Sequence, residues 1–349
     1  HGEVFYKNNK MPTLMALAEA GLKPIPNLVA KEGLSLINGT QVMVAVGAIT
    51  LYDAIKLAKL ADITGSLSLE ALRGIKDAFD RKIHEARGQL GQMHVASNIL
   101  KLTNGSEFLT SQGEIRVQDA YSLRCLAQVH GASRDAFEYI KEKVEIEMNA
   151  ATDNPLIFEN EVISGGNFHG QPMAIAFDFL KIAIAELANI SERRIERLVN
   201  PQLSEGLPAF LVANPGLNSG FMIVQYVAAS LVSENKVLAH PASVDSIPSS
   251  ANQEDHVSMG SISARKVLSI LANVQNIVAI EIICACQALE FRDRRKLAPA
   301  TQAVYDLVRA HIPPLKQDRF LEPEIKVARD LVVSGKVLEA VEDTIGSTK

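Results

Sequence analysis

A run of 30 residues without glycine or proline, 261–290, limits what this chain can fold into more than any other feature of its sequence. A single helix of that length would extend about 45 Å. Apolar residues spread around most of the circumference of such a helix, as in a helix enclosed by other helices. They recur at helical spacing, at Val267, Leu268, Ile270, Leu271, Val274, Ile277 and Val278. The run therefore predicts the central helix of a bundle.

Two more long runs, 173–199 and 221–239, also lack glycine and proline and predict long helices. Segments 41–60 and 67–87 predict two others, separated by a turn at 63–66. Alternating strand patterns are limited to 4–6 and 157–163. Together these features predict an all-α fold built as a bundle of long helices. No low-complexity linker divides the chain, so the sequence places no internal domain boundary within 1–349, which we expect to form a central helical bundle followed by C-terminal helices.

The composition excludes several classes of protein. Hydrophobic residues make up 47% and charged residues 21%, which is typical of a soluble globular protein. The net charge of −5 and the absence of a basic stripe argue against a nucleic-acid partner. Arg265 and Lys266 would be costly in lipid, so we expect no membrane span. Cys125, Cys284 and Cys286 do not form a disulfide framework, which indicates a reducing cytoplasm.

Two polar segments carry side chains that could act on a small zwitterion. Asn38 lies in Leu-Ile-Asn-Gly-Thr-Gln at 36–41, for which a turn and helix N-cap is the structural alternative. In the second segment, Gln118, Tyr121 and Arg124 are spaced by three, which predicts one stripe on a helix. An arginine there could bind a carboxylate bidentately and a tyrosine could transfer a proton. The structural alternative is an ion pair between Asp119 and Arg124 on a surface helix.

Two further segments are rich in polar residues. The first runs from Thr-Asp-Asn-Pro-Leu at 152–156 to Ser-Gly-Gly-Asn-Phe-His-Gly at 164–170 and contains Phe168. It predicts either a pocket wall or a simple connecting loop, and its glycines do not match a phosphate-binding motif. The other, 249–259, contains Gln253 and Glu254 between two apolar runs, where buried polar groups would need partners. No HExxH or CxxC motif is present, so no metal site is expected.

Taken in order, these four segments resemble the motifs of the histidine ammonia-lyase family across essentially the whole chain. They read LINGTQ, VQDAYSLRC, TDNPL with SGGNFHG, and SANQEDHVSMG. The resemblance implies an all-helical bundle of the aspartase and fumarase type, assembled as a homotetramer with active sites shared between subunits. It implies elimination of ammonia from L-histidine to give trans-urocanate, assisted by the electrophile methylidene imidazolone and requiring no metal.

The resemblance also implies roles for individual residues. Tyr121 would be a catalytic hydroxyl, and Glu254 would contact the imidazole or take part in proton transfer. The substrate-binding residues would be Asn38, Gln118, Arg124, Phe168 and Gln253, with Arg124 on the carboxylate and Phe168 beside the electrophile and the ring. The acidic Glu254 resembles the histidine branch of the family, since an acid suits an imidazole better than a benzene ring.

The electrophile forms from an Ala-Ser-Gly triplet, and none occurs in these 349 residues. The resemblance places the triplet upstream of residue 1, together with a lid tyrosine and a substrate-contacting histidine. We therefore expect the 349 residues alone to be inactive and the complete protein to be active. Three alternatives remain: a non-catalytic helical scaffold for oligomerisation, a lyase or aminomutase of the same family acting on tyrosine or phenylalanine, and the fumarase/aspartase type, whose signature loop is not recognisable.

Overall fold

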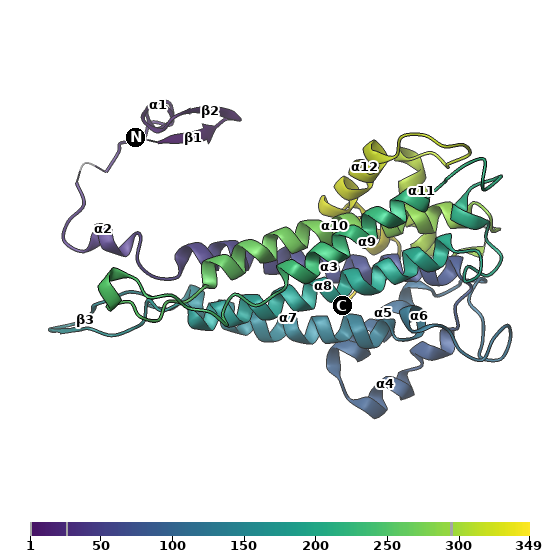
Figure 1. Cartoon of the computed structure of the whole chain (residues 1–349), viewed down its shortest axis with the longest axis horizontal. Coiled ribbons are helices and arrows are strands. Elements are labelled where there is room, and N and C mark those ends of the chain that lie inside the picture. Colours follow the sequence, from purple (N-terminus) through teal and green to yellow (C-terminus); the bar gives the residue numbers. More distant parts are fainter. Residues whose placement is uncertain (1, 26, 294–295) are drawn as a thin grey trace. The chain divides into compact units, whose positions relative to one another are not determined.

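The computed structural model describes residues 2–25, 27–293 and 296–349, and their contacts divide the chain into two units. The larger comprises Thr40–Ala150 and Gly170–Lys349. Its long helices lie side by side (Figure 1), with α10 packed on α8, α3, α12 and α9. The five longest are α3 (Gln41–Ala71), α7 (Leu126–Met148), α8 (Gln171–Val199), α9 (Met222–Leu238) and α10 (Gly260–Leu289). This arrangement confirms the predicted all-α bundle and the central position of the 261–290 run.

Helix α3 corrects the prediction of two helices separated by a turn at 63–66. It continues through these residues, and Thr64 and Ser66 donate their hydroxyls to the backbone oxygens four residues earlier, at 2.8 and 2.9 Å. Hydroxyls that bond within a helix do not end it. Gly65 lies where α3 approaches α7, since a Cβ there would be 2.5 Å from Leu126 Cδ1. The turn-forming residues thus serve close packing instead.

The predicted helix at 67–87 is also wrong, because α3 ends at Ala71. A short 3-10 helix, η1 (Lys76–Phe79), and α4 (Arg81–Arg87) follow. Asp80 caps α4 by accepting a hydrogen bond from the backbone N–H of Lys82 at 2.9 Å. The larger unit also contains α5 (Leu90–Leu102), α6 (Tyr121–Arg124), η2 (Ala209–Leu211), η3 (Ser250–Asn252), α11 (Pro299–His311), α12 (Glu322–Val333) and α13 (Lys336–Ile345).

Helices α3 and α10 are long and apolar enough to cross a bilayer by length and composition alone. In α10, 67% of the most apolar window is buried inside the protein, against 44% in α3. Helices of the bundle cover α10 from several sides, so its apolar character follows from its place in the core.

The smaller unit comprises residues 1–39 and 151–169 and contains two hairpins. Strand β1 (Glu3–Tyr6) pairs antiparallel with β2 (Asn9–Pro12), which confirms a strand at 4–6. The predicted strand at 157–163 is instead a hairpin of β3 (Leu156–Phe158) and β4 (Glu161–Ile163), reversing at Glu159 with φ 43°. Two short helices, α1 (Thr13–Glu19) and α2 (Glu32–Ser35), complete the unit.

Candidate active site

In the smaller unit, Asn38 is held by a residue far away in the sequence. Its Nδ2 donates to Oδ1 of Asp153 at 2.9 Å. The turn and N-cap predicted as the structural alternative are present, with Gly39 at φ 105° and Thr40 as the N-cap of α3, but Thr40 makes no side-chain capping bond and Asn38 is not the cap. The Asn38 side chain therefore belongs to a tertiary contact, in which TDNPL meets LINGTQ.

The next residue, Asn154, links the same motif to the glycine-rich segment. Its Oδ1 accepts hydrogen bonds from the backbone N–H of Gly165 at 2.6 Å and from the Ser164 hydroxyl at 3.2 Å. Phe168, three residues beyond Gly165, is half-buried. Asp153 and Asn154 thus tie the segments that carry Asn38 and Phe168 into one unit. The family resemblance includes TDNPL as a motif, but the sequence alone predicted no function for Asp153.

In the larger unit, Tyr121 and Arg124 form a pair on the single turn of α6. The Arg124 guanidinium carbon lies 4.7 Å from the Tyr121 ring centroid, within the range of a cation–π contact. The tyrosine is 70% exposed. Arg124 Nε is buried and has no hydrogen-bond partner among the described residues. A phenol and a guanidinium thus lie together, as predicted, with donor capacity that the described residues leave unused.

Gln118 does not join them on a helical stripe, and that prediction is wrong. Residue 120, the N-cap of α6, has an extended conformation with ψ 157°, so the helix cannot continue back to Gln118, which is exposed. The alternative Asp119–Arg124 ion pair is also wrong. Asp119 instead accepts bonds from the Ile75 backbone N–H and from Arg116 Nε, both at 2.6 Å. These bonds hold the segment before α6 in its non-helical course.

Glu254 and Gln253 lie on the connection between α9 and α10, and both are exposed. The expectation that this polar run is buried between apolar helices is wrong, since the run lies outside them. Glu254 Oε2 accepts the Ser249 hydroxyl at 2.7 Å, and the two residues also exchange backbone hydrogen bonds. Between them, residues 250–252 all have φ between 51° and 68°, a left-handed conformation that costs energy outside glycine. The loop is thus held in a strained shape.

Buried side chains on α8 fix both ends of this connection. Asp178 accepts bonds from the Ser243 backbone N–H at 2.8 Å and from the Ser263 hydroxyl at 2.7 Å, while Lys181 donates to the His240 carbonyl at 3.0 Å. Burial opposes ionisation of Asp178. Hydrogen bonds from Lys181, Ser243 and Ser263 outweigh this effect and lower its pKa to about 2.

Within one chain, the Glu254 loop and α6 lie against different parts of α8. The loop is bonded to Asp178, whereas Arg194 reaches the backbone oxygen of Ser122 in α6 at 3.5 Å. Asp178 and Arg194 are sixteen positions apart on α8, which corresponds to about 24 Å along its axis. A single chain therefore does not bring Glu254 to the Tyr121–Arg124 pair.

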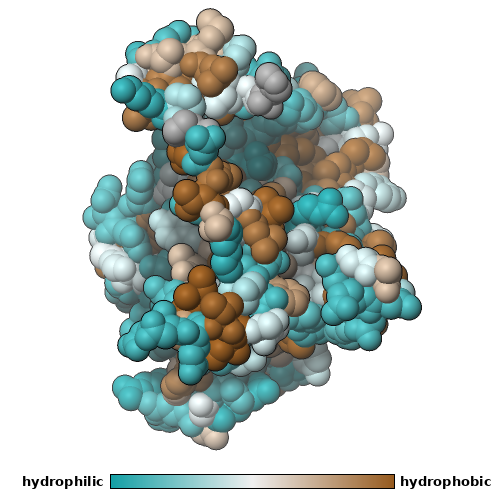
Figure 2. Space-filling view, turned by 90° about the vertical axis from the view of Figure 1, so that its left-hand side faces the viewer, coloured by the Kyte–Doolittle hydropathy of each residue, from teal (hydrophilic) through white to brown (hydrophobic). Residues whose placement is uncertain are grey.

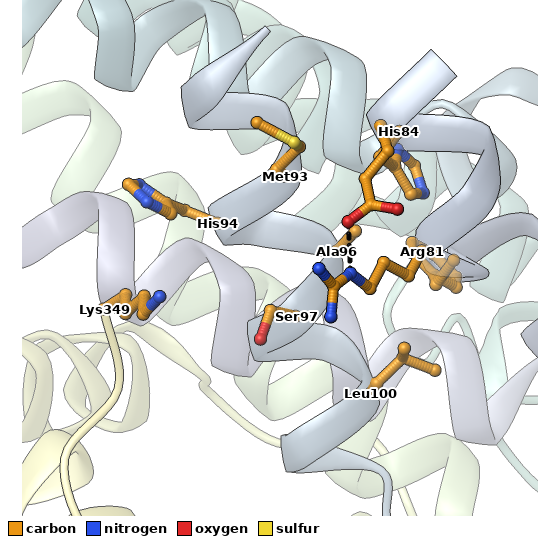
Figure 3. Close-up of a pocket in the computed structure, with 10 residues that line it drawn as sticks. Arg81, His84, Met93, His94, Ala96, Ser97, Leu100 and Lys349 are labelled. Carbon is orange, nitrogen blue, oxygen red and sulfur yellow. Dashed lines mark hydrogen bonds and ion pairs between the residues drawn. The ribbon is translucent and has the colours of Figure 1, made fainter. Parts of the chain in front are cut away.

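A cavity of about 420 Å³ lies away from all of these residues, between α4 and α5. Arg81 pairs there with Glu85, and Figure 3 shows His94 and Lys349 on the side of the cavity opposite Arg81. The ring nitrogens of His84 face the Ala78 carbonyl and the Gln92 amide, and burial lowers the pKa of this histidine. His84 thus has a structural role, with both ring nitrogens held by neighbouring groups. No group of three or more His, Cys, Asp or Glu placed to hold a metal ion occurs within 2–25, 27–293 and 296–349.

The chain is similar in sequence to known proteins. The sequence profile of the family described as "Aromatic amino acid lyase" matches residues 1–310. The chain is 62% identical over 346 residues to the histidine ammonia-lyase of Alkaliphilus metalliredigens, covering 99% of this chain and 68% of that protein.

The chain is also similar to solved structures. The crystal structure of histidine ammonia-lyase from Trypanosoma cruzi matches with a TM-score of 0.90 at 46% identity, over 99% of this chain and 66% of that one. Tyrosine aminomutase from Streptomyces globisporus matches with a TM-score of 0.95 at 39% identity, over 100% and 70%. The chain belongs to the aromatic amino acid lyase family.

Proposed function

We propose that the complete protein is a histidine ammonia-lyase, a carbon–nitrogen lyase that eliminates ammonia from L-histidine to give trans-urocanate. The 62% identity to a histidine ammonia-lyase over nearly the whole chain carries this proposal. The structure supports it with a phenol and a guanidinium side by side at α6 and with an exposed carboxylate on the α9–α10 connection.

The roles follow from the chemistry of each group. Arg124 binds the substrate carboxylate, because a planar guanidinium matches a carboxylate through two parallel hydrogen bonds. Asn38 orients the amino-acid end with its amide. Tyr121 acts as the hydroxyl that handles a proton at the reaction centre. Glu254, with Gln253 beside it, accepts an imidazole N–H or takes part in proton transfer, which an acid can do for histidine and not for a phenyl ring.

The family's electrophile, methylidene imidazolone, makes the amine a better leaving group when it is present. It forms from Ala-Ser-Gly, which these 349 residues do not contain. We propose that Tyr121 and Gln118, which offer exposed hydrogen-bonding groups, and Phe168, which offers a half-buried ring, would line such a group. These side chains line the reaction centre and orient the substrate. We expect the 349 residues alone to give no urocanate.

We propose that the active site is completed by self-association into a homotetramer. One chain keeps Glu254 away from Tyr121, so the proposed site needs a second copy to supply one of them. The long helices also expose large apolar side chains that water disfavours. Figure 2 shows further hydrophobic patches on the face at the left-hand side of Figure 1. Among the exposed residues are Ile49 63%, Tyr52 61%, Ile175 53%, Tyr226 63% and Leu268 50%. We place the protein in the cytoplasm, which its three unpaired cysteines support.

The test is the incubation of the complete protein with L-histidine, followed by the near-ultraviolet absorbance of the conjugated product and by ammonia release. Urocanate and ammonia in equal amounts are expected. The similarity to tyrosine aminomutase makes a β-amino acid product the specific alternative, so tyrosine and phenylalanine are assayed in parallel. Faster conversion of either, or no conversion by a folded tetramer, would contradict the proposal, the second result favouring a non-catalytic scaffold.

A further inference from the structure

We infer that Asp153 is a positioning residue that fixes the amide of Asn38 for substrate binding. The inference rests on the proposed function, in which Asn38 orients the amino-acid end of histidine. It concerns a residue 115 positions away from Asn38 in sequence, joined to it by a 2.9 Å hydrogen bond.

The Asp153 carboxylate has donors on both of its oxygens. Oδ1 accepts from Asn38 Nδ2 at 2.9 Å and from the Asn154 backbone N–H at 2.7 Å, and Oδ2 accepts from the Ser35 hydroxyl at 2.8 Å and from Lys31. A carboxylate offers about four acceptor sites, so these four bonds saturate it. The carboxylate is therefore locked in place, and only 19% of its side-chain surface is exposed.

A locked carboxylate gives the Asn38 amide a defined direction. An asparagine amide has a donor end and an acceptor end of nearly the same shape, which exchange when the group turns by half a circle. Turning Asn38 would place Oδ1 against a negatively charged oxygen, which is unfavourable. Asp153 therefore keeps Nδ2 toward itself and Oδ1 away from itself, where an acceptor suits the ammonium of an amino-acid substrate.

The same contacts also fix the charge state of Asp153. Lys31 neutralises Asp153, and hydrogen bonds from Lys31, Asn38 and Ser35 hold the pKa of the aspartate well below its usual range. The carboxylate therefore remains an acceptor throughout the pH range in which the protein is assayed.

The test is a double-mutant cycle in the complete protein. We expect Asp153→Ala to lower kcat/KM for histidine by about 10- to 100-fold, mainly through KM, as losses of supporting residues do. In the Asn38→Ala background the same change should cost less than about twofold, because coupled residues are not additive. Independent, multiplicative losses would overturn the inference.

Two variants separate positioning from folding. Glu161→Gln removes a negative charge from an exposed position in the same unit, and Lys31→Met removes a partner of Asp153 without touching Asn38. We expect Glu161→Gln to keep kcat/KM within about threefold of the unaltered protein, and Lys31→Met to lower it less than Asp153→Ala does, since Asp153 still accepts from Asn38 in both variants. If Lys31→Met matches Asp153→Ala, general loosening of the cluster explains the loss and the inference fails.

A structural measurement does not depend on turnover. Crystal structures of the unaltered protein and of Asp153→Ala should show one amide orientation of Asn38 in the first and a changed or mixed orientation in the second. An unchanged Asn38 in the variant would refute the positioning role. Absence of urocanate formation by the unaltered protein would refute the proposed function instead, and the crystal structures would still decide the role of Asp153.

Discussion

Arg194 and Glu281 form a bidentate ion pair in the centre of the bundle, with no exposed surface on either side chain. Nε and Nη2 of Arg194 lie 2.5 and 2.9 Å from the two carboxylate oxygens, and the hydroxyls of Ser68 and Ser191 donate to the same oxygens. The pair thus joins α8 to α10 and α3.

Removing one member of this pair leaves a buried charge without its partner. Arg194→Met should lower the free energy of unfolding by about 3–5 kcal/mol, measured by urea denaturation of the complete protein. Combining it with Glu281→Leu should recover most of that loss, because two apolar side chains no longer need compensation. If the double variant is as unstable as the single one, burial of an uncompensated charge is not the cause.

Gly131 permits a backbone-to-backbone contact between α7 and α5. A Cβ at this position would lie 2.3 Å from the Gln92 backbone nitrogen and 2.5 Å from its Cα, and backbone atoms cannot move aside as a side chain can. Gly131→Ala should therefore lower the free energy of unfolding by about 1–3 kcal/mol, as overpacking does. The exposed Glu138→Ala on the same helix is the control and should change it by less than about 0.5 kcal/mol.

Glu70 makes stability depend on pH in a defined direction. Burial raises its pKa from 4.5 to about 7. Below pH 4.5 the carboxyl is protonated in both folded and unfolded protein, so its ionisation does not change the free energy of unfolding. Between pH 4.5 and 7 the unfolded chain releases the proton and the folded one keeps it, so stability falls as pH rises, by about 3 kcal/mol at most.

Glu70→Gln should remove this fall, so that the stability of the variant relative to the unaltered protein increases from pH 4.5 to 7 and then levels off. The measurement is urea denaturation at a series of pH values, with Glu138→Gln as the exposed control. A constant difference across the series would show that Glu70 does not titrate in this range.

Asp178 should control the mobility of the Glu254 loop. Asp178→Asn removes the charge that holds Lys181, Ser243 and Ser263, so we expect faster hydrogen–deuterium exchange in peptides covering 241–259. Under the proposed function, KM for histidine should rise by about tenfold. Glu186→Gln, an exposed change on α8, should leave both unaltered. Increased exchange throughout the bundle would indicate general destabilisation instead.

Tyr121 and Arg124 should differ in the kinetic constant that each affects. Tyr121→Phe removes only the hydroxyl and should lower kcat by about 10²- to 10⁴-fold, as expected for a proton-transfer group. Arg124→Lys keeps the charge but loses the planar fork, so it should act mainly by raising KM. If Tyr121→Phe lowers kcat for histidine by no more than it weakens the binding of the product, the hydroxyl does not act in proton transfer.

The sequence predicted the long helices well where composition and packing agree. The 261–290 and 173–199 runs form α10 and α8, because their apolar surface is removed from water only when other helices pack around it. Predictions based on local turn residues failed. The residues at 63–66 form part of α3, since Leu126 of α7 packs against Gly65 and the neighbouring hydroxyls bond within the helix.

Only part of the candidate site could be predicted from the sequence. Motif resemblance selected Tyr121 and Arg124, and the structure places the two in contact, but spacing alone wrongly put Gln118 on their helix. Lys31, Ser35 and Asp153 received no role, because nothing in a linear sequence shows that residues more than one hundred positions apart share one carboxylate.

By itself, the sequence determined the helical class and the central helix, because periodicity is a local property, and its motifs supplied the candidate site residues. The tertiary structure decided which of those residues meet: Asp153 with Asn38, Asp178 with both ends of the Glu254 loop, and Arg194 with Glu281. These contacts depend on how distant helices pack, and packing arises from the whole chain at once rather than from any segment of it.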